Sequence, residues 1–484
     1  MSVSDQMLVT LKWMSPALVL LFGGCLVLCA SIFLSPIRST GVDNRRNLLA
    51  SISMFLIVLA AACHLFVSNA VLSTPVESGL FRFDSISVAA ERLSLIGGVI
   101  LILLSWSLAP KNYLPEFYGC LLLILSAIPI IGASNDLIAM FLALELVSIP
   151  TYILLSIAKG DNASFEAALK YFTLSGFASC FFLLGMSYMY GLSGSMDLGS
   201  VHAMLGNGGG GKLGLLAILL MFCGLAFRIT AVPFHFYGPD VFEGTSLTMA
   251  AIMSYLPKVA GFVAMIRLFG AESIGPLVAP QVVPVLLVVA ALTMCIGNAL
   301  AVSQTSLRRL LGYSSIAHTG YLILGYAALL LSNAEPQVLF TYLAAYAAMT
   351  LGVFACLAEI DEAGGQSIVV GDLAGMYYRR PAASIAMSIC LLSLIGLPLT
   401  AGFVAKLQLF FAAGAANRWD MTLCVWLMAF NAAIAAGYYF RLLSKLFERG
   451  LDLPALRLWR PSLFLAYSLC AVLTIVWFFQ PTSM

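Results

Sequence analysis

The sequence has few charged residues: Asp, Glu, Lys and Arg together make up 10% of its 484 positions. A soluble domain carries about 25% charged residues, so this composition excludes a large soluble catalytic domain. Lys and Arg number 24 against 22 for Asp and Glu, which excludes the strongly basic surface that binds nucleic acid through its phosphates. The 61% share of apolar residues instead indicates a protein whose partner is the lipid bilayer.

The sequence also lacks the motifs of a metal or redox centre. Its eleven cysteines lie in apolar stretches and none forms a C-x-x-C pair, the close spacing typical of zinc sites and iron–sulfur clusters. The glycine-rich segment 205–213 is similar to a phosphate loop, but Leu213 stands where that loop needs a hydroxyl. We therefore interpret the segment as a flexible linker. His64, in an apolar helix, and His202, in this loop, are interpreted as structural.

Apolar runs long enough to cross a bilayer recur along the whole chain. They cover residues 16–35, 48–72, 85–108, 114–134, 135–158, 164–190, 213–235, 247–269, 280–303, 306–331, 337–359, 382–413, 419–446 and 461–480. The sequence therefore predicts an all-α polytopic membrane protein with about fourteen transmembrane helices.

Lys and Arg are unevenly divided between the two sides of these spans. Loops after odd-numbered spans hold fourteen of them, whereas loops after even-numbered spans and the N-terminal segment hold five. Cytoplasmic loops are the ones enriched in Lys and Arg. Both termini are therefore predicted to lie on the non-cytoplasmic side.

Charged or titratable side chains lie inside separate apolar spans: Glu145, Arg228, Lys258, His318 and Lys406. An ionised side chain at a helix centre costs about 2.5–3.5 kcal/mol on insertion scales, so the four charged ones cannot all face lipid. They could pair and merely fix the helix bundle. Intramembrane groups of this kind mark proton relays and ion paths, and their number here favours ion conduction. Lys170 and His235 are weaker candidates.

Proline interrupts two of the spans. Span seven contains Pro233 and span twelve contains Pro398. A broken membrane helix exposes backbone polar groups, which is tolerated only beside protein or a water-filled cavity. The breaks therefore predict a transport path.

The two broken spans also suggest an internal repeat. A glycine precedes a cation by four residues in both, as Gly224 with Arg228 and Gly402 with Lys406. The spans lie five apart, and an odd offset reverses direction in the membrane, as in an inverted repeat. We predict four units: a three-helix segment at 1–113, a first five-helix repeat at 114–269, a second, inverted one at 280–446, and a C-terminal helix at 447–484.

At these positions the sequence resembles the antiporter-like membrane subunits of respiratory complex I and of the related multisubunit cation/proton antiporters. The resemblance covers spans four to thirteen and is carried by residues 142–146 (LALEL), 166–171 (EAALKY), 232–235 (VPFH), 239–244 (PDVFEG), 257–258 (PK), 309–318 (RLLGYSSIAH) and 396–406 (GLPLTAGFVAK). The span number, the length and a Lys in span twelve are most similar to one of the complex I subunits.

The resemblance implies a role for each matching residue. Glu145 would pair with the cation of span seven and tune it, Lys258 would connect two half-channels, His318 would relay a proton, and Lys406 would exchange its proton with the outside. The chain would work with other membrane and peripheral subunits, which would hold NADH, flavin, iron–sulfur clusters and quinone, in a bacterial inner membrane. No cofactor or metal is expected in this chain.

One residue departs from the family pattern, because Arg228 stands where the family usually has Lys. A guanidinium is not deprotonated in proteins, so Arg228 can be a fixed charge or a bidentate partner of Glu145, but not a conventional proton carrier. Three functions stay open: a conducting subunit biased by Arg228, a scaffold subunit whose pump Arg228 impairs, and a cation/proton antiporter subunit without a redox partner.

Overall fold

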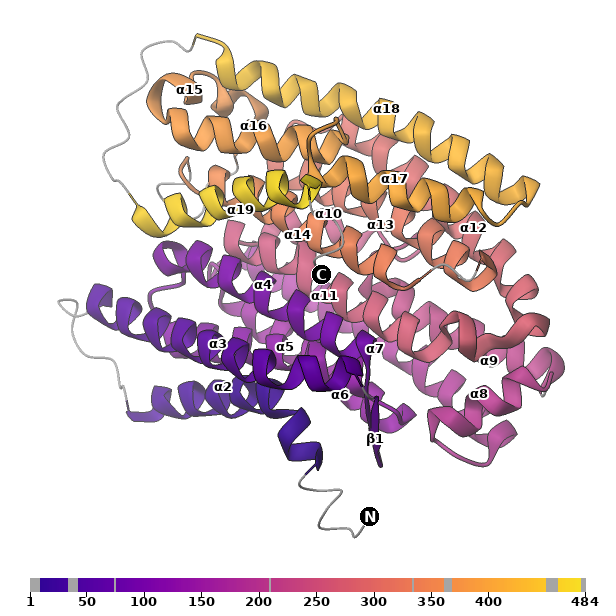
Figure 1. Ribbon diagram of the computed structural model, residues 1–484. Helices are drawn as coiled ribbons and strands as arrows, with labels where there is room; N and C mark the ends of the chain where they lie inside the picture. Colours follow the sequence, from indigo (N-terminus) through magenta and orange to yellow (C-terminus); the bar gives the residue numbers. More distant parts are fainter. Residues whose placement is uncertain are drawn as a thin grey trace.

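The computed structural model describes residues 9–33, 42–73, 75–208, 210–332, 335–360, 368–449 and 460–479. The chain ends at 1–8 and 480–484, whose side of the membrane was predicted, lie outside the described residues, as do the loop cations Arg38 and Arg457. The described chain is a bundle of long helices, with α2 and α3 at one edge and α18 at the opposite edge (Figure 1).

The first half of the chain forms helices and one short hairpin. These elements are α2 (Ser15–Phe33), α3 (Val42–Ser73), β1 (Val76–Ser78), β2 (Phe81–Phe83), α4 (Ser85–Leu108), α5 (Leu114–Ala133), α6 (Leu137–Ile157), α7 (Asn162–Ser193), α8 (Leu198–Gly206), α9 (Gly211–Arg228), α10 (Tyr237–Gly244) and α11 (Leu247–Phe269).

The second half is helical in its described part. Its elements are α12 (Ala271–Val302), α13 (Leu307–Ser332), α14 (Gln337–Leu357), the 3-10 turn η2 (Val370–Leu373), α15 (Met376–Arg379), α16 (Pro381–Ile395), α17 (Ala401–Gly414), α18 (Trp419–Phe447) and α19 (Pro461–Phe479).

The all-α polytopic class is confirmed. Within the described residues, twelve helices are long and apolar enough to cross a membrane, and α2, α16 and α17 contain shorter apolar stretches. The count of fourteen takes α16 and α17 together as one span, and its seventh span, 213–235, ends before α10 begins at Tyr237; the count stays a prediction, as do the four units. Several helices extend beyond the apolar run, for example α3 from Val42 and α12 from Ala271, because helical hydrogen bonds continue into polar flanking residues.

Burial separates an inner group of helices from an outer one. Every residue of α11 is buried, and α13 and α14 are buried over almost their whole length. In contrast, α3, α7 and α18 leave large apolar side chains such as Phe66, Phe172 and Phe430 exposed, as expected of faces that contact lipid. The inner helices therefore carry the residues that are shielded from lipid.

Both predicted helix breaks occur. Helix α9 ends at Arg228 and α10 begins at Tyr237; helix α16 ends at Ile395 and α17 begins at Ala401. Arg228 precedes its break, whereas Lys406 follows the other one. Gly224 and Arg228 therefore lie before their break, whereas Gly402 and Lys406 lie after theirs. The prediction of an inverted repeat is thus left to rest on the presence of the two breaks and not on the matching segments.

Short elements between the spans were not predicted. His202 lies on α8 rather than in a loop, with Nε2 2.9 Å from the Leu268 carbonyl oxygen. The predicted linker is shorter than expected, because α8 continues to Gly206 and α9 begins at Gly211. Apolar runs of bilayer length cannot predict a nine-residue helix such as α8.

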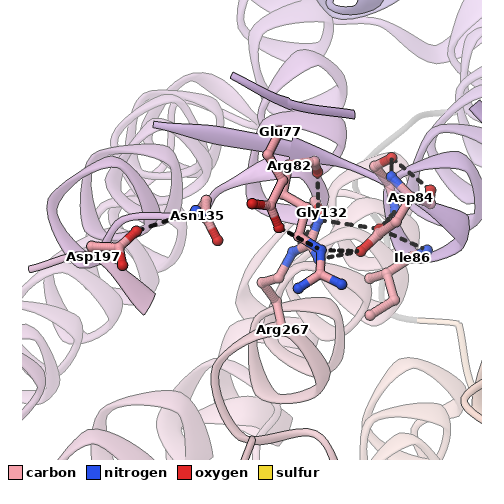
Figure 2. Close-up of polar contacts among 9 residues, drawn as sticks. Glu77, Arg82, Asp84, Ile86, Gly132, Asn135, Asp197 and Arg267 are labelled. Atoms are coloured by element: carbon pink, nitrogen blue, oxygen red, sulfur yellow. Dashed lines mark hydrogen bonds and ion pairs between the residues drawn. The ribbon is translucent and has the colours of Figure 1, made fainter. Parts of the chain in front are cut away.

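A buried ionic network joins the unpredicted hairpin to the core (Figure 2). Asp84 caps α4 by accepting from the backbone N–H of Ile86 at 3.1 Å, and it also accepts from Arg267 Nη1 at 2.6 Å. Arg267 donates to the carbonyl oxygens of Gly132 at 2.8 Å and Arg82 at 2.7 Å. The network connects α4, α5 and α11, so Arg267 is a buried residue of α11 and not a loop cation.

Candidate functional site

The charged residues predicted inside the spans lie on five different helices: Glu145 on α6, Arg228 on α9, Lys258 on α11, His318 on α13 and Lys406 on α17. The four basic residues are between 1% and 7% exposed. The structure brings Glu145 and Arg228 into direct contact, and it surrounds each of the other three with neutral polar groups.

The Glu145–Arg228 pair shares one carboxylate oxygen. Arg228 Nη2 donates to Glu145 Oε1 at 2.7 Å, and Ser179 Oγ donates to the same oxygen at 2.7 Å. Arg228 Nη1 donates to the Leu144 carbonyl oxygen at 2.8 Å and to Ser148 Oγ. The bidentate contact considered from the sequence is therefore wrong, because the second guanidinium nitrogen is occupied by α6 groups. Glu145 and Arg228 therefore form an ion pair through one carboxylate oxygen and one guanidinium nitrogen.

The break after α9 is stabilised by hydroxyl groups. Tyr237 donates to the Phe227 carbonyl oxygen at 2.8 Å, and Thr293 accepts from the Val232 N–H at 3.1 Å. Thr319 of α13 donates to the Ile229 carbonyl oxygen at 2.9 Å. Neighbouring helices thus satisfy the backbone groups that the break frees.

Lys258 lies among hydroxyls, without an ion pair in the described chain. Its ammonium donates to Ser315 Oγ at 2.6 Å and to the Ser315 carbonyl oxygen. The hydroxyl of Tyr346 lies 3.4 Å away and donates to Ser315 Oγ at 3.0 Å. The ammonium also lies 4.8 Å from the centre of the Tyr346 ring, in cation–π range. Neutral oxygens and a ring face therefore hold this charge.

His318 has a hydroxyl near each ring nitrogen. Nδ1 lies 2.6 Å from the hydroxyl of Tyr342, and Nε2 lies 3.5 Å from that of Tyr439, which in turn bonds Ser314. An imidazole can take up a proton on one nitrogen and release it from the other. The arrangement therefore suits proton transfer between α14 and α18.

Lys406 faces the end of the preceding helix fragment. Its ammonium donates to the carbonyl oxygens of Leu394 at 2.7 Å and Ile395 at 2.9 Å. These belong to the last turn of α16, where free carbonyls carry partial negative charge. Gly396 has φ +88°, and a Cβ there would lie 3.0 Å from Lys406 Cδ, so the break requires glycine. The second break thus builds an ammonium site out of backbone.

Tyr321 lies between His318 and Lys406. Its ring centre is 5.5 Å from that of His318 and 5.6 Å from the Lys406 ammonium. Its hydroxyl accepts from Asn298 Nδ2 at 3.1 Å. The sequence analysis missed Tyr321, Tyr342 and Tyr346 as site residues. The i,i+4 spacing of the last two, on one face of a span, was a usable signal.

Lys170 and His235, the two weaker candidates, lie away from the five residues predicted inside the spans. Lys170 is 45% exposed at its side chain and pairs with Glu166 at 2.7 Å and with Asp240 at 3.7 Å. His235 lies half-buried within the break after α9. Among the described residues, no hydrogen bond or ion pair joins either of them to the five predicted site residues, which are Glu145, Arg228, Lys258, His318 and Lys406. No group of three or more His, Cys, Asp or Glu in the described chain could hold a metal ion.

Comparisons with known proteins identify the family of this chain. A family model described as "NADH:quinone oxidoreductase/Mrp antiporter, TM" matches residues 134–433. NADH-quinone oxidoreductase subunit N of Geobacillus kaustophilus is 38% identical over 408 residues, which are 82% of this chain and 81% of that protein. Subunit N of another Geobacillus strain is 35% identical, covering 93% and 92%.

Solved structures give the same result. A chain of respiratory complex I from Thermus thermophilus superposes with a TM-score of 0.80 at 29% identity, covering 97% of this chain and 98% of that one. A chain of the Mrp complex from Dietzia has a TM-score of 0.80 at 18% identity, covering 98% and 95%; at that identity it shows the fold alone. The chain belongs to the NADH:quinone oxidoreductase/Mrp antiporter membrane family, in its NADH-quinone oxidoreductase subunit N branch.

Proposed function

We propose that this chain, as the N subunit of a proton-translocating NADH:quinone oxidoreductase, carries protons along the line Lys258, His318 and Lys406. In this proposal, Glu145 and Arg228 set the charge where the line begins, near Lys258. The observation that carries the proposal is the hydroxyl contacts around the first two of these residues, inside helices that are shielded from lipid.

A chain of polar groups supports the order of transfer. Thr319 Oγ donates to the carbonyl oxygens of Ile229, next to Arg228, and of Ser315, beside Lys258. Ser314 is the preceding residue of α13, and its hydroxyl bonds Tyr439, the tyrosine near His318. Hydroxyls both donate and accept hydrogen bonds, so those of Thr319, Ser314 and Tyr439 can take part in proton transfer without a bound cofactor, whereas the two carbonyl oxygens only accept.

Arg228 acts in this scheme as a permanent charge. Because it keeps its proton, it is a fixed positive charge 2.7 Å from Glu145 and repels a second positive charge nearby. Within the described residues, neither Lys258 nor Lys406 has a carboxylate partner, so we propose that both can release and regain a proton.

The work is driven from other subunits. Each proton moved against the membrane potential costs about 2.3 kcal/mol per 100 mV, and we propose that electron transfer from NADH to quinone in partner subunits supplies it. Flavin, iron–sulfur clusters and the quinone site belong to those partners. Bacterial relatives and the Lys/Arg asymmetry support placing the chain in a bacterial inner membrane, with both termini on the non-cytoplasmic side.

The test is Lys406→Ala in the assembled complex. We expect NADH-driven proton uptake in inverted membrane vesicles to lose the share carried by this subunit, while NADH oxidation by an artificial acceptor and co-purification of flavin stay normal. Lys212→Ala, which removes an exposed lysine at the start of α9, is the control. Normal pumping by Lys406→Ala would sink the proposal. Co-purification without flavin or NADH activity would instead favour the cation/proton antiporter function.

A further inference from the structure

A cavity of about 1350 Å³ lies away from the buried line, on the side of the molecule predicted to face the cytoplasm. It is bounded by the first turn of α3, the end of α4, the α6–α7 connection and the start of α19. Much of this lining lies outside residues 134–433, the part that matches the family model.

The lining is rich in cations. Four line the cavity, namely Arg46, Lys111, Lys159 and Arg460, against the two carboxylates Asp43 and Asp161. Both carboxylates are engaged: Asp43 pairs with Arg46 at 3.0 Å, and Asp161 accepts from the Ser164 N–H at the start of α7 at 2.8 Å. The cavity therefore presents an excess of positive charge to an incoming anion.

Two buried donors at this cavity are left without a partner. In the described chain, Arg46 Nε and Ser107 Oγ are buried and make no hydrogen bond, although both residues line the cavity. Buried polar atoms are rarely left unsatisfied. A phosphate oxygen, which accepts hydrogen bonds and carries negative charge, has the chemistry that these donors require.

Apolar side chains continue the cavity toward the bilayer centre. Leu103 lies one helical turn deeper than Ser107 on α4, and Leu465 lies one turn deeper than Pro461 on α19, where it is 55% exposed. Trp106 lies at the level of the cations and donates to Asn47 Oδ1 at 3.0 Å. Cations and an aromatic ring at the interface with apolar surface below match the layers of a phospholipid.

We propose that this cavity binds one anionic phospholipid, with the phosphate between the cations and the acyl chains along α4 and α19. Basic pockets between membrane helices on the cytoplasmic side bind such headgroups. The apolar rim distinguishes the lipid from free phosphate, which has no use for it. The inference is independent of the proton path.

The test uses the purified complex in phosphatidylcholine nanodiscs with photo-crosslinking phosphatidylglycerol as the probe. We expect the probe to label peptides at the end of α4 and the start of α19, and a phosphatidylcholine probe to label them weakly. Each Lys near an anionic headgroup contributes about 1 kcal/mol, and about 1.4 kcal/mol is tenfold in affinity. Lys111→Gln with Lys159→Gln should therefore weaken labelling by about 30-fold.

The matched control is Arg441→Gln with Lys445→Gln, which removes two cations of α18 on the same predicted side but outside the cavity. Labelling should persist in this variant and in excess inorganic phosphate. Equal labelling by the two lipid probes, unchanged labelling of the cavity variant, an equal loss in the control, or displacement by inorganic phosphate would each overturn the proposal.

Discussion

The buried charges of the site are stabilised in different ways at the two ends of the line, Arg228 and Lys406. At one end, Arg228 is neutralised by Glu145 through a 2.7 Å ion pair. Along the rest of the line, Lys258 and Lys406 are surrounded by hydroxyl and carbonyl oxygens, and neither has an ion pair in the described chain. A charge matched by an opposite charge is held in place, whereas one held only by neutral dipoles can leave as a proton.

The largest expected contrast is in stability, between removing the carboxylate of the ion pair and removing a lysine that has no ion pair in the described chain. Glu145→Leu leaves Arg228 buried without its carboxylate, and breaking a buried pair in this way costs about 3–5 kcal/mol. Lys258→Met removes a buried charge together with its desolvation cost, so stability should stay the same or rise. Thermal unfolding of the detergent-solubilised complex measures both. Equal destabilisation by the two variants would remove the distinction between the ends.

The next effect concerns the tyrosine hydroxyls. Tyr342→Phe removes the group 2.6 Å from His318 Nδ1. A positioned proton donor or acceptor is worth about 10²–10⁴-fold in rate, so we expect proton transfer through this subunit to slow by about 100-fold with little change in assembly.

Tyr326→Phe is the matched control for this substitution. Tyr326 is also a buried tyrosine of the inner helices, but its hydroxyl donates to the Phe269 carbonyl oxygen at 2.8 Å. Stopped-flow measurement of NADH-driven acidification compares the two variants. Equal rates for both would show that His318 does not pass protons to α14.

A smaller effect is expected from Arg228→Lys, which tests whether arginine impairs the pump. Lysine keeps the positive charge near Glu145 but cannot also reach the Leu144 carbonyl and Ser148, both bonded by Arg228 Nη1. We expect an unchanged number of protons per electron and a slightly lower melting temperature. A rise in protons per electron, measured with a pH electrode during NADH pulses, would support the scaffold function with an impaired pump.

The smallest effect lies outside the spans, at His202 of α8. Burial lowers the pKa of this imidazole below its usual value near 6.5. The folded state then binds fewer protons than the unfolded chain, so the stabilisation is present above pH 6.5 and is lost as the pH falls below it.

His202→Gln should remove this pH dependence, because Gln has no titrating group but can still donate to the Leu268 carbonyl. Hydrogen exchange of α8 between pH 5 and 8 measures it, and pumping should not change. A pumping defect in this variant would extend the proton path beyond the inner helices.

Much of the site could be predicted from the sequence, because a charged residue inside an apolar run is visible without coordinates. The five charged or titratable residues of the spans were all identified in this way. Both breaks were also predicted, from Pro233 and Pro398, although proline alone does not decide a break, because α5, α6 and α11 continue through Pro129, Pro150 and Pro257. The tyrosines of the site were not identified, because the sequence of an apolar span does not distinguish a tyrosine that only packs from one that relays a proton. Only the i,i+4 spacing of Tyr342 and Tyr346 offered a signal. For Lys170, the contact with Asp240 of α10 could not be predicted, because it depends on how α10 packs against α7.

Composition and periodicity by themselves determined that this chain is a helical membrane protein with charges too costly to face lipid. Each of those inferences depends on free energies of transfer that are local to one span. Only the tertiary structure decided which charges are paired and which are held by neutral oxygens. That choice depends on helices far apart in the sequence, such as α11 with α13 at Ser315 or α13 with α18 at Tyr439. Packing between distant helices leaves no periodic signal in either of them.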